Sequence, residues 1–411
     1  MRHTTILLIG NGFDIAHGLP TQYIDFLHFI NLFMNMKNYN DTFVKFYEKI
    51  IKSYGCKEIV KEYIISIYDK TDFSNPDKEP PVHLVHLFKQ INSYDQCVDY
   101  SAFFNLEHNF WYKYFNNKKH ILAGWVDFES EMSKVIQNIH RIKTCIELRK
   151  IEDISSDLIE LMVYVMDMHD NHNKHMNDCY NTNRPKLTFN PESFDVDNFA
   201  IYQNYLVMQL TNFIKGLELY LRIFVENQDI GVISPEIDTV VNGVGFDYIL
   251  NFNYTNTFLK VYSNCVNKTK YCQIHGETNY EDPNQVCNMI LGIDDYLDDS
   301  ESSKDTFCIP FKKFYQRIHK ETDFNYINWI EEIEKIDNKF LYIFVHSLDV
   351  TDKDILEKFI CIERMRTAIY YHDETAFGSQ IENLVKVLGK ETFLKKFHSK
   401  EIVFLKQSDM K

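Results

Sequence analysis

The fold of this chain is decided by residues 4–23, Thr-Thr-Ile-Leu-Leu-Ile-Gly-Asn-Gly-Phe-Asp-Ile-Ala-His-Gly-Leu-Pro-Thr-Gln-Tyr. The apolar run Thr5–Ile9 predicts a buried parallel strand that ends at Gly10. Gly10 and Gly12 predict a sharp turn, and because glycine has no Cβ, the backbone of this turn can approach a ligand closely. The spacing leaves one alternative open, a tight turn between a strand and a helix without any ligand.

Polar side chains cluster directly after this turn. Asn11, Asp14 and His17 lie where a phosphate would be held by backbone N–H groups and by the positive end of the following helix. The residues 18–21, Gly-Leu-Pro-Thr, predict a second turn whose threonine is the N-cap of the next helix. The opening stretch therefore predicts a nucleotide-binding turn.

The composition is that of a globular protein. The 411 residues suffice for two domains, or for one domain with a large insertion. The net charge of −15 disfavours general nucleic-acid binding, which needs a basic face. The sequence shows no apolar run of membrane-spanning length and no signal peptide, so a cytoplasmic protein is expected. Nine scattered cysteines without a Cys-x-x-Cys pair argue against a disulfide framework.

Two kinds of pattern divide the chain. Residues 22–244 have mainly helical periodicity. From residue 245 onward, short apolar runs alternate with helical stretches, which predicts a parallel α/β sheet that also takes in the first strand. We therefore predict a Rossmann-like domain of residues 1–21 and 245–411, with a mostly parallel sheet and a large inserted all-helical domain of residues 22–244.

Several apolar runs end in polar residues. We expect strands at Thr5–Ile9, Tyr248–Phe252, Cys272–Ile274, Tyr342–Val345 and Ile369–Tyr371, and a further apolar run at Met289–Asp295. Ligands of open parallel sheets bind beyond the carboxyl ends of the strands. The polar residues that follow these runs are therefore candidates for one shared site.

The opening residues 10–21 closely resemble the signature of the abortive-infection AbiH family of bacterial antiphage proteins. Three later segments are similar to the same family, Leu291–Asp295, Phe311–Arg317 and His346–Asp352. The resemblance extends from Ile6 to about Tyr371. It implies a role in phage defence.

A second resemblance is to sirtuins. The opening turn is similar to a distant version of the sirtuin opening, and Asn253 aligns with the central Asn of a sirtuin strand-end motif, although Thr255 stands where that motif has Asp. His275 and Gly276 resemble the sirtuin His-Gly, and the segment around Ser347 is similar to a third sirtuin motif. This resemblance implies a sirtuin-like fold and NAD as ligand or substrate.

The leading hypothesis is an antiphage effector that hydrolyses the nicotinamide–ribose bond of NAD, with two predicted catalytic residues. His275 is expected to act as the base, since imidazole titrates near neutral pH, and Asn253 is expected to position the ribose. The predicted NAD-binding residues are Gly10, Asn11, Gly12, Asp14, His17, Asn253, Ser347 and Asp349. A Gly12→Val substitution is expected to abolish binding and to leave the fold largely intact.

Two alternatives belong to other functional classes. The first is a module that senses NAD or ADP-ribose without turnover. The second is a metal-dependent nuclease that would use Asp294, Asp295 and Glu277, although our leading hypothesis expects no resident metal. We expect a small-molecule nucleotide as partner, an unidentified phage trigger and no membrane, and the oligomeric state stays open, with a homo-oligomer as one option.

Other charged residues have open roles. Asp352 and Asp354 are expected to cap the helix that follows them. Lys312, Lys313 and Arg317 either neutralise phosphates or lie on a solvated helix face. The pair Asp127 and Glu129 is singled out only by the family resemblance.

Overall fold

The computed structural model describes residues 3–37, 101–118, 127–176, 187–226, 230, 234–266, 269–278, 286–293, 306–322 and 324–409. The described chain falls into two compact units. The first comprises the described residues within 1–98, 218–290 and 317–411, and the second those within 99–217 and 291–316.

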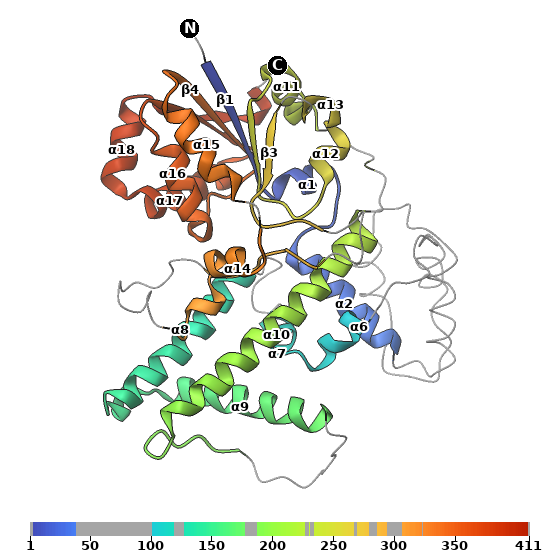
Figure 1. Ribbon diagram of the computed structural model, residues 1–411, viewed down its shortest axis with the longest axis vertical. Coiled ribbons are helices and arrows are strands. Elements are labelled where there is room, and N and C mark those ends of the chain that lie inside the picture. Colours follow the sequence, from blue (N-terminus) through green and yellow to red (C-terminus); the bar gives the residue numbers. More distant parts are fainter. Residues whose placement is uncertain are drawn as a thin grey trace. The chain divides into compact units, whose positions relative to one another are not determined.

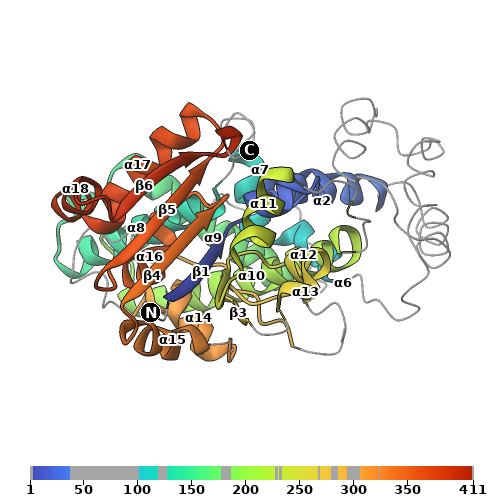
Figure 2. The same cartoon turned by 90° about the horizontal axis from the view of Figure 1, so that it is seen from above.

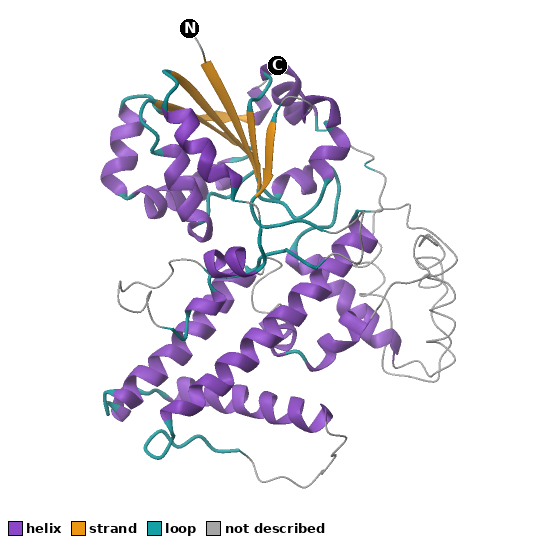
Figure 3. Ribbon diagram, viewed as in Figure 1, coloured by secondary structure: helices purple, strands orange, loops and turns teal. Residues whose placement is uncertain are grey.

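The first unit is built on one parallel sheet of six strands (Figure 3). Its strands are β1 His3–Ile9, β2 Tyr248–Asn251, β3 Lys270–Gln273, β4 Asn338–Phe344, β5 Met365–Tyr371 and β6 Ile402–Lys406. The spatial order is β3-β2-β1-β4-β5-β6, which is the order of a doubly wound, Rossmann-type sheet. In the register of the sheet, Ile9 at the end of β1 lies opposite both Asn251 and Phe344. The ends of the three central strands therefore lie at the same level.

Helices cover both faces of this sheet. Figure 1 shows α15 Asn325–Glu334, α16 Lys353–Ile360, α17 Glu374–Leu388 and α18 Lys390–His398 on one side. On the other side lie α1 Gly12–Ala16, α11 Pro235–Val244 and α12 Thr257–Val261, and Figure 2 shows the same arrangement from above. The other helical elements of the first unit are α2 Tyr23–Lys37, α13 Ser263–Val266, a π-helical turn Leu221–Val225 and short 3-10 turns at Val350–Asp352 and Gln407–Asp409.

The apolar sequence of β1 explains its central place. Alternate residues of a strand point to opposite faces of a sheet, and all of Ile6–Ile9 are fully buried. Ile6 and Leu8 pack in the core on the side of α15–α18, and Leu7 and Ile9 pack in the core with α1, α11 and α12. A strand buried on both faces needs such an unbroken apolar run.

The second unit shows helices and loops in its described residues, and no strand (Figure 3). Its helices are α6 Ser101–Phe104, α7 Phe110–Lys118, α8 Phe128–Glu147, α9 Ser156–Met176 and α10 Phe199–Tyr220, with 3-10 turns at Asn105–His108, Ile151–Asp153, Val196–Asn198 and Ile309–Phe311. Helix α10 continues into the first unit beyond Leu217, and α14 Lys313–His319 also contributes residues to both units. Aromatic rings fill the interior, for example Phe115 stacked on Phe128 with ring centroids 4.2 Å apart.

The predicted parallel α/β sheet is confirmed, because all five predicted strands lie in it and the first strand is central. Two details of the prediction were wrong. The run Met289–Asp295 is not a strand in its described part, where it has only an isolated bridge between Ile293 and Lys312. Strand β6 was not predicted. The sirtuin-like fold and the division into residues 1–21 plus 245–411 and 22–244 stay predictions.

Candidate functional site at the carboxyl edge of the sheet

The carboxyl edge of the sheet carries most of the residues predicted for the site. Gly10 follows β1, Asn253 follows β2, His275 follows β3 and Ser347 follows β4. The order of the strands reverses at β1, and open parallel sheets bind their ligands beside such a position. The structure therefore brings four predicted segments to one edge of one sheet.

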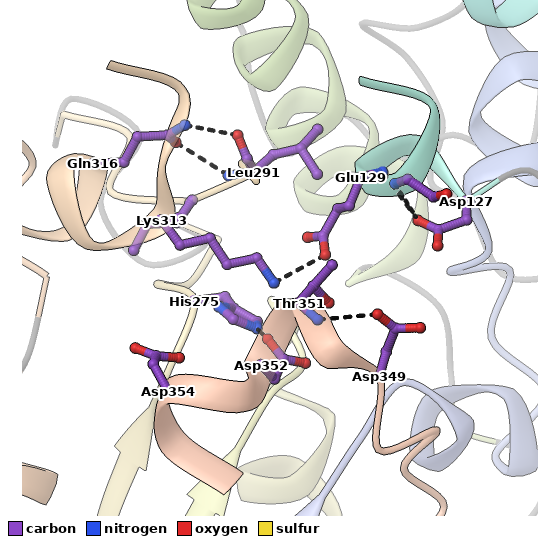
Figure 4. Close-up of polar contacts among 12 residues, drawn as sticks. Asp127, Glu129, His275, Leu291, Lys313, Gln316, Asp349, Thr351, Asp352 and Asp354 are labelled. Atoms are coloured by element: carbon purple, nitrogen blue, oxygen red, sulfur yellow. Dashed lines mark hydrogen bonds and ion pairs between the residues drawn. The ribbon is translucent and has the colours of Figure 1, made fainter. Parts of the chain in front are cut away.

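A buried carboxylate joins two histidines at this edge. Asp352 Oδ1 lies 3.0 Å from Nε2 of His275, and Asp352 Oδ2 lies 3.5 Å from Nε2 of His346. Figure 4 shows the His275 and Asp352 side chains pointing toward one another. His346, His275 and Asp352 are 5%, 6% and 7% exposed, so water screens their interactions poorly. Phe252 packs edge-on against both imidazole rings, with centroids 5.3 Å from His275 and 4.6 Å from His346.

Hydrogen bonds fix where the two histidines carry their protons. The N–H of Leu348 donates to Nδ1 of His346 at 2.9 Å, so a neutral His346 carries its proton on Nε2, toward Asp352. The same carboxylate faces Nε2 of His275, which places the lone pair of a neutral His275 on Nδ1. A carboxylate in this position orients an imidazole and stabilises it when it is protonated. His275 is thus arranged to accept a proton on Nδ1.

This role of Asp352 was not predicted from the sequence. The prediction for Asp352 was a helix cap, but its side chain makes no capping hydrogen bond to α16. The cap in this segment is Asp349, whose side chain accepts from the N–H of Thr351 at 3.0 Å (Figure 4). Asp349, predicted to bind NAD, therefore supports the 3-10 turn that carries Asp352. Ser347 is exposed, and its backbone oxygen accepts from Asn383.

Asn253 is held by the end of β2. Its N–H and its Nδ2 both donate to Oδ1 of Asn251 at 2.9 Å, and Asn251 Nδ2 donates to the Tyr271 hydroxyl at 2.7 Å. Within the described residues, the buried Oδ1 of Asn253 has no hydrogen-bond partner. A buried acceptor without a donor costs about 1–3 kcal/mol. This oxygen is therefore suited to accept from a ligand hydroxyl or amide.

The glycines of the opening turn pack against the end of β4. The N–H of Gly10 donates to the Phe344 carbonyl and that of Gly12 to the Val345 carbonyl. A Cβ on Gly10 would lie 2.7 Å from Cδ2 of His346, and one on Gly12 would lie 2.8 Å from Cβ of Val345. Both glycines are thus needed for packing, whether or not a ligand binds. A valine at Gly12 would overlap Val345, the residue after β4, so we expect Gly12→Val to disturb the fold as well as binding.

The three polar residues of the opening stretch have separate environments. Asn11 is exposed, and its Oδ1 accepts from the Thr21 hydroxyl at 2.8 Å. Asp14 is buried and accepts from the Thr255 hydroxyl at 2.7 Å. Burial raises the pKa of Asp14 to about 7, although its hydroxyl donors act in the opposite direction. Asp14 can therefore exist in either protonation state near neutral pH.

His17 lies among aromatic side chains. Its Nδ1 is 2.7 Å from the Phe13 carbonyl, which makes Nδ1 the donor, and its ring packs against Phe13 and Tyr262. Burial lowers the pKa of His17, so the ring is kept neutral. These contacts give His17 a role in packing the interior. Its contact with NAD stays a prediction.

The family comparison agrees with the signatures in the sequence. The model of the family described as bacteriophage abortive infection AbiH matches residues 6–371. The chain belongs to the AbiH family. The match begins within β1 at Ile6 and ends with β5 at Tyr371, so it includes the three residues of the His275–Asp352–His346 cluster, and β6 lies beyond it. Comparison with curated proteins and with solved structures gives no match.

In this AbiH protein, two cations of α14, Lys313 and Arg317, are paired with carboxylates. Lys313 is buried and its Nζ lies 2.9 Å from Oε2 of Glu129 within the second unit (Figure 4). Arg317 is also buried and donates to Asp354 at 2.7 Å within the first unit. Asp127 is the N-cap of α8. Lys312, Lys313 and Arg317 are all buried, so the expectation of a solvated helix face was wrong.

The remaining AbiH residues of interest concern metals and membranes. Asp294 and Asp295 lie outside the described residues. No group of three or more His, Cys, Asp or Glu side chains in the described part of the chain could hold a metal ion. Among the helices that the structure describes, none is long and apolar enough to cross a membrane.

Proposed function

We propose that this protein acts in AbiH-type phage abortive infection by binding NAD at the carboxyl edge of its sheet and hydrolysing the nicotinamide–ribose bond. The abortive-infection role follows from the family match. The observation that supports the chemistry is the buried pair of His275 and Asp352, 3.0 Å apart at the end of β3. The Rossmann-type strand order and the resemblance of three segments to sirtuins support NAD as the substrate.

The proposed reaction needs one proton acceptor. Water attacks C1′ of the nicotinamide ribose, and the C–N bond breaks with its electron pair passing to the nicotinamide nitrogen. Nδ1 of His275 takes the proton of the water, while Asp352 stabilises the resulting imidazolium. Oδ1 of Asn253 accepts a hydrogen bond from a ribose hydroxyl. The products are nicotinamide, ADP-ribose and a proton.

The structure constrains how NAD would reach these groups. His275 and Asn253 are 6% and 3% exposed, so turnover requires the loops that follow the strands to open. The N–H groups of Gly10 and Gly12 donate to the carbonyls of Phe344 and Val345, so the proposed diphosphate contacts come from the exposed Asn11 and Ser347 instead. Rare opening would make basal turnover slow before infection, yet measurable with purified protein.

One alternative keeps the binding site and omits the reaction. The same burial of His275 and Asn253 favours a protein that senses NAD or ADP-ribose and signals without turnover. In that case the His275–Asp352 pair only stabilises the edge of the sheet.

The test is to measure NAD, nicotinamide and ADP-ribose in infected bacteria that express the wild-type protein or His275→Ala. A panel of phages is used because the trigger is unidentified. We expect NAD to fall, and both products to rise, faster in infected cells with the wild-type protein than in uninfected cells or in cells with His275→Ala. Cells that are protected from phage while their NAD stays constant would overturn hydrolysis in favour of the sensor.

A further inference from the structure

Glu226 joins three segments of the first unit. It is 5% exposed and follows the π-helical turn at the end of α10, where its N–H bonds to the carbonyl of Leu221 at 2.8 Å. Its Oε1 accepts from the N–H of Asn256 at 2.6 Å and from the hydroxyl of Thr278 at 2.8 Å. Its Oε2 is paired with Lys260 of α12, which also donates to the Glu226 carbonyl at 2.7 Å.

The segments that Glu226 holds are those that carry the proposed catalytic residues. Asn256 lies three residues after Asn253, and Thr278 lies three residues after His275. The two loops are also bonded to each other, because the N–H of Thr278 donates to the Tyr254 carbonyl at 2.9 Å. Hydrogen bonds to a charged carboxylate are stronger than those between neutral groups. Glu226 is therefore the shared anchor of both loops.

We propose that Glu226 is a positioning residue for the proposed reaction, holding the loops 253–256 and 275–278 in register with one another and connecting both to α10. This inference rests on the proposed function, since it concerns the same site. π-Helical turns inside or after α-helices occur frequently at functional sites. The turn continues α10 without a break, so Glu226 ties both loops to the end of this helix.

Purified variants test the proposal by hydrogen exchange and by kinetics with NAD. Glu226→Ala removes the anchor, and Glu226→Gln keeps an acceptor for Asn256 and Thr278. The matched control is Glu218→Ala, because Glu218 is a similarly buried carboxylate that pairs with Arg222 at 3.2 Å.

We expect the amide hydrogens of peptides 253–258 and 275–278 to exchange faster in Glu226→Ala than in the wild type. We also expect kcat to fall by about 10- to 100-fold with a nearly constant KM, because small displacements of reacting groups slow the chemical step. Glu226→Gln should restore most of both properties. The control Glu218→Ala should leave exchange in the two loops unchanged.

A milder variant covers the case in which Glu226→Ala does not fold. Thr278→Val removes one donor to Glu226 with little change in volume, and we expect faster exchange at 275–278 and a smaller loss in kcat. The inference would be overturned if the two loops exchanged at the wild-type rate in both Glu226→Ala and Thr278→Val. It would also be overturned if they exchanged as fast in the control Glu218→Ala as in Glu226→Ala. If the wild-type protein releases no nicotinamide, the proposed function fails, while the exchange comparison still decides the role of Glu226.

Discussion

His275→Ala is expected to lower kcat for nicotinamide release by about 10²- to 10⁴-fold, which corresponds to roughly 3–5 kcal/mol of activation free energy. The reason is that Nδ1 of His275 is the proposed proton acceptor, held in its tautomer by the Asp352 carboxylate 3.0 Å from Nε2. The imidazole acts as the water attacks, so its loss weakens the transition state more than the bound substrate. We therefore expect the affinity for NAD, measured by calorimetry, to change little.

The matched control is His372→Ala. His372 follows β5 at the same edge of the sheet, but its side chain is 67% exposed and pairs with Asp373 instead of Asp352. It should retain wild-type kcat. A His275→Ala protein that is folded and still releases nicotinamide at the wild-type rate would show that His275 has a structural role only.

Gly276→Ala is expected to reduce the free energy of unfolding by about 3 kcal/mol or more. Gly276 has φ +77°, a region that costs L-residues free energy, and its Cβ would lie 2.3 Å from the backbone oxygen of Asn288. That contact is with backbone, so the overlap can be relieved only by displacing the segment that follows β3. Urea unfolding monitored by circular dichroism measures the loss.

Gly378→Ala in α17 is the comparison for this substitution. An added Cβ at Gly378 meets nothing within 4 Å, and alanine has the higher helix propensity, so stability should rise by up to about 1 kcal/mol. If Gly276→Ala were as stable as Gly378→Ala, the tight approach of residues 276 and 288 would not exist in solution.

The sequence predicted the sheet well, because burial on both faces leaves a clear signal. Ile6–Ile9 is an unbroken apolar run, and a run of this kind specifies a central parallel strand. Strand β6 gives a weaker signal, because at this border of the sheet the buried Ile402 is followed by the exposed Val403. The position of Asn253 and His275 at one edge of the sheet could be predicted from the strands, because parallel strands have their carboxyl ends at the same edge.

The partners of the candidate residues could not be predicted, because they come from distant parts of the chain. Asp352 lies 77 residues from His275, and an aspartate directly before a helix, three residues after the capping Asp349, resembles any helix start. Gly10 and Gly12 were predicted to leave space for a ligand. In the structure, His346 and Val345, which follow β4, fill the space beside them. Nothing in the sequence around Glu226 predicts its role, because its partners Asn256 and Thr278 come close to it only in the folded chain.

The central claim is that the edge residues of this sheet hydrolyse NAD, and proton NMR of NAD incubated with purified protein tests it most directly. Three proteins are compared: the wild type, Asp352→Asn, which removes the carboxylate charge beside His275, and Asp373→Asn. Asp373 caps α17 by accepting from the N–H of Ala376, and asparagine caps a helix equally well. The account predicts that signals of free nicotinamide grow with the wild type and with Asp373→Asn, and at least about 100-fold more slowly with Asp352→Asn. Equal rates in all three proteins, or intact NAD with the wild type, would contradict it.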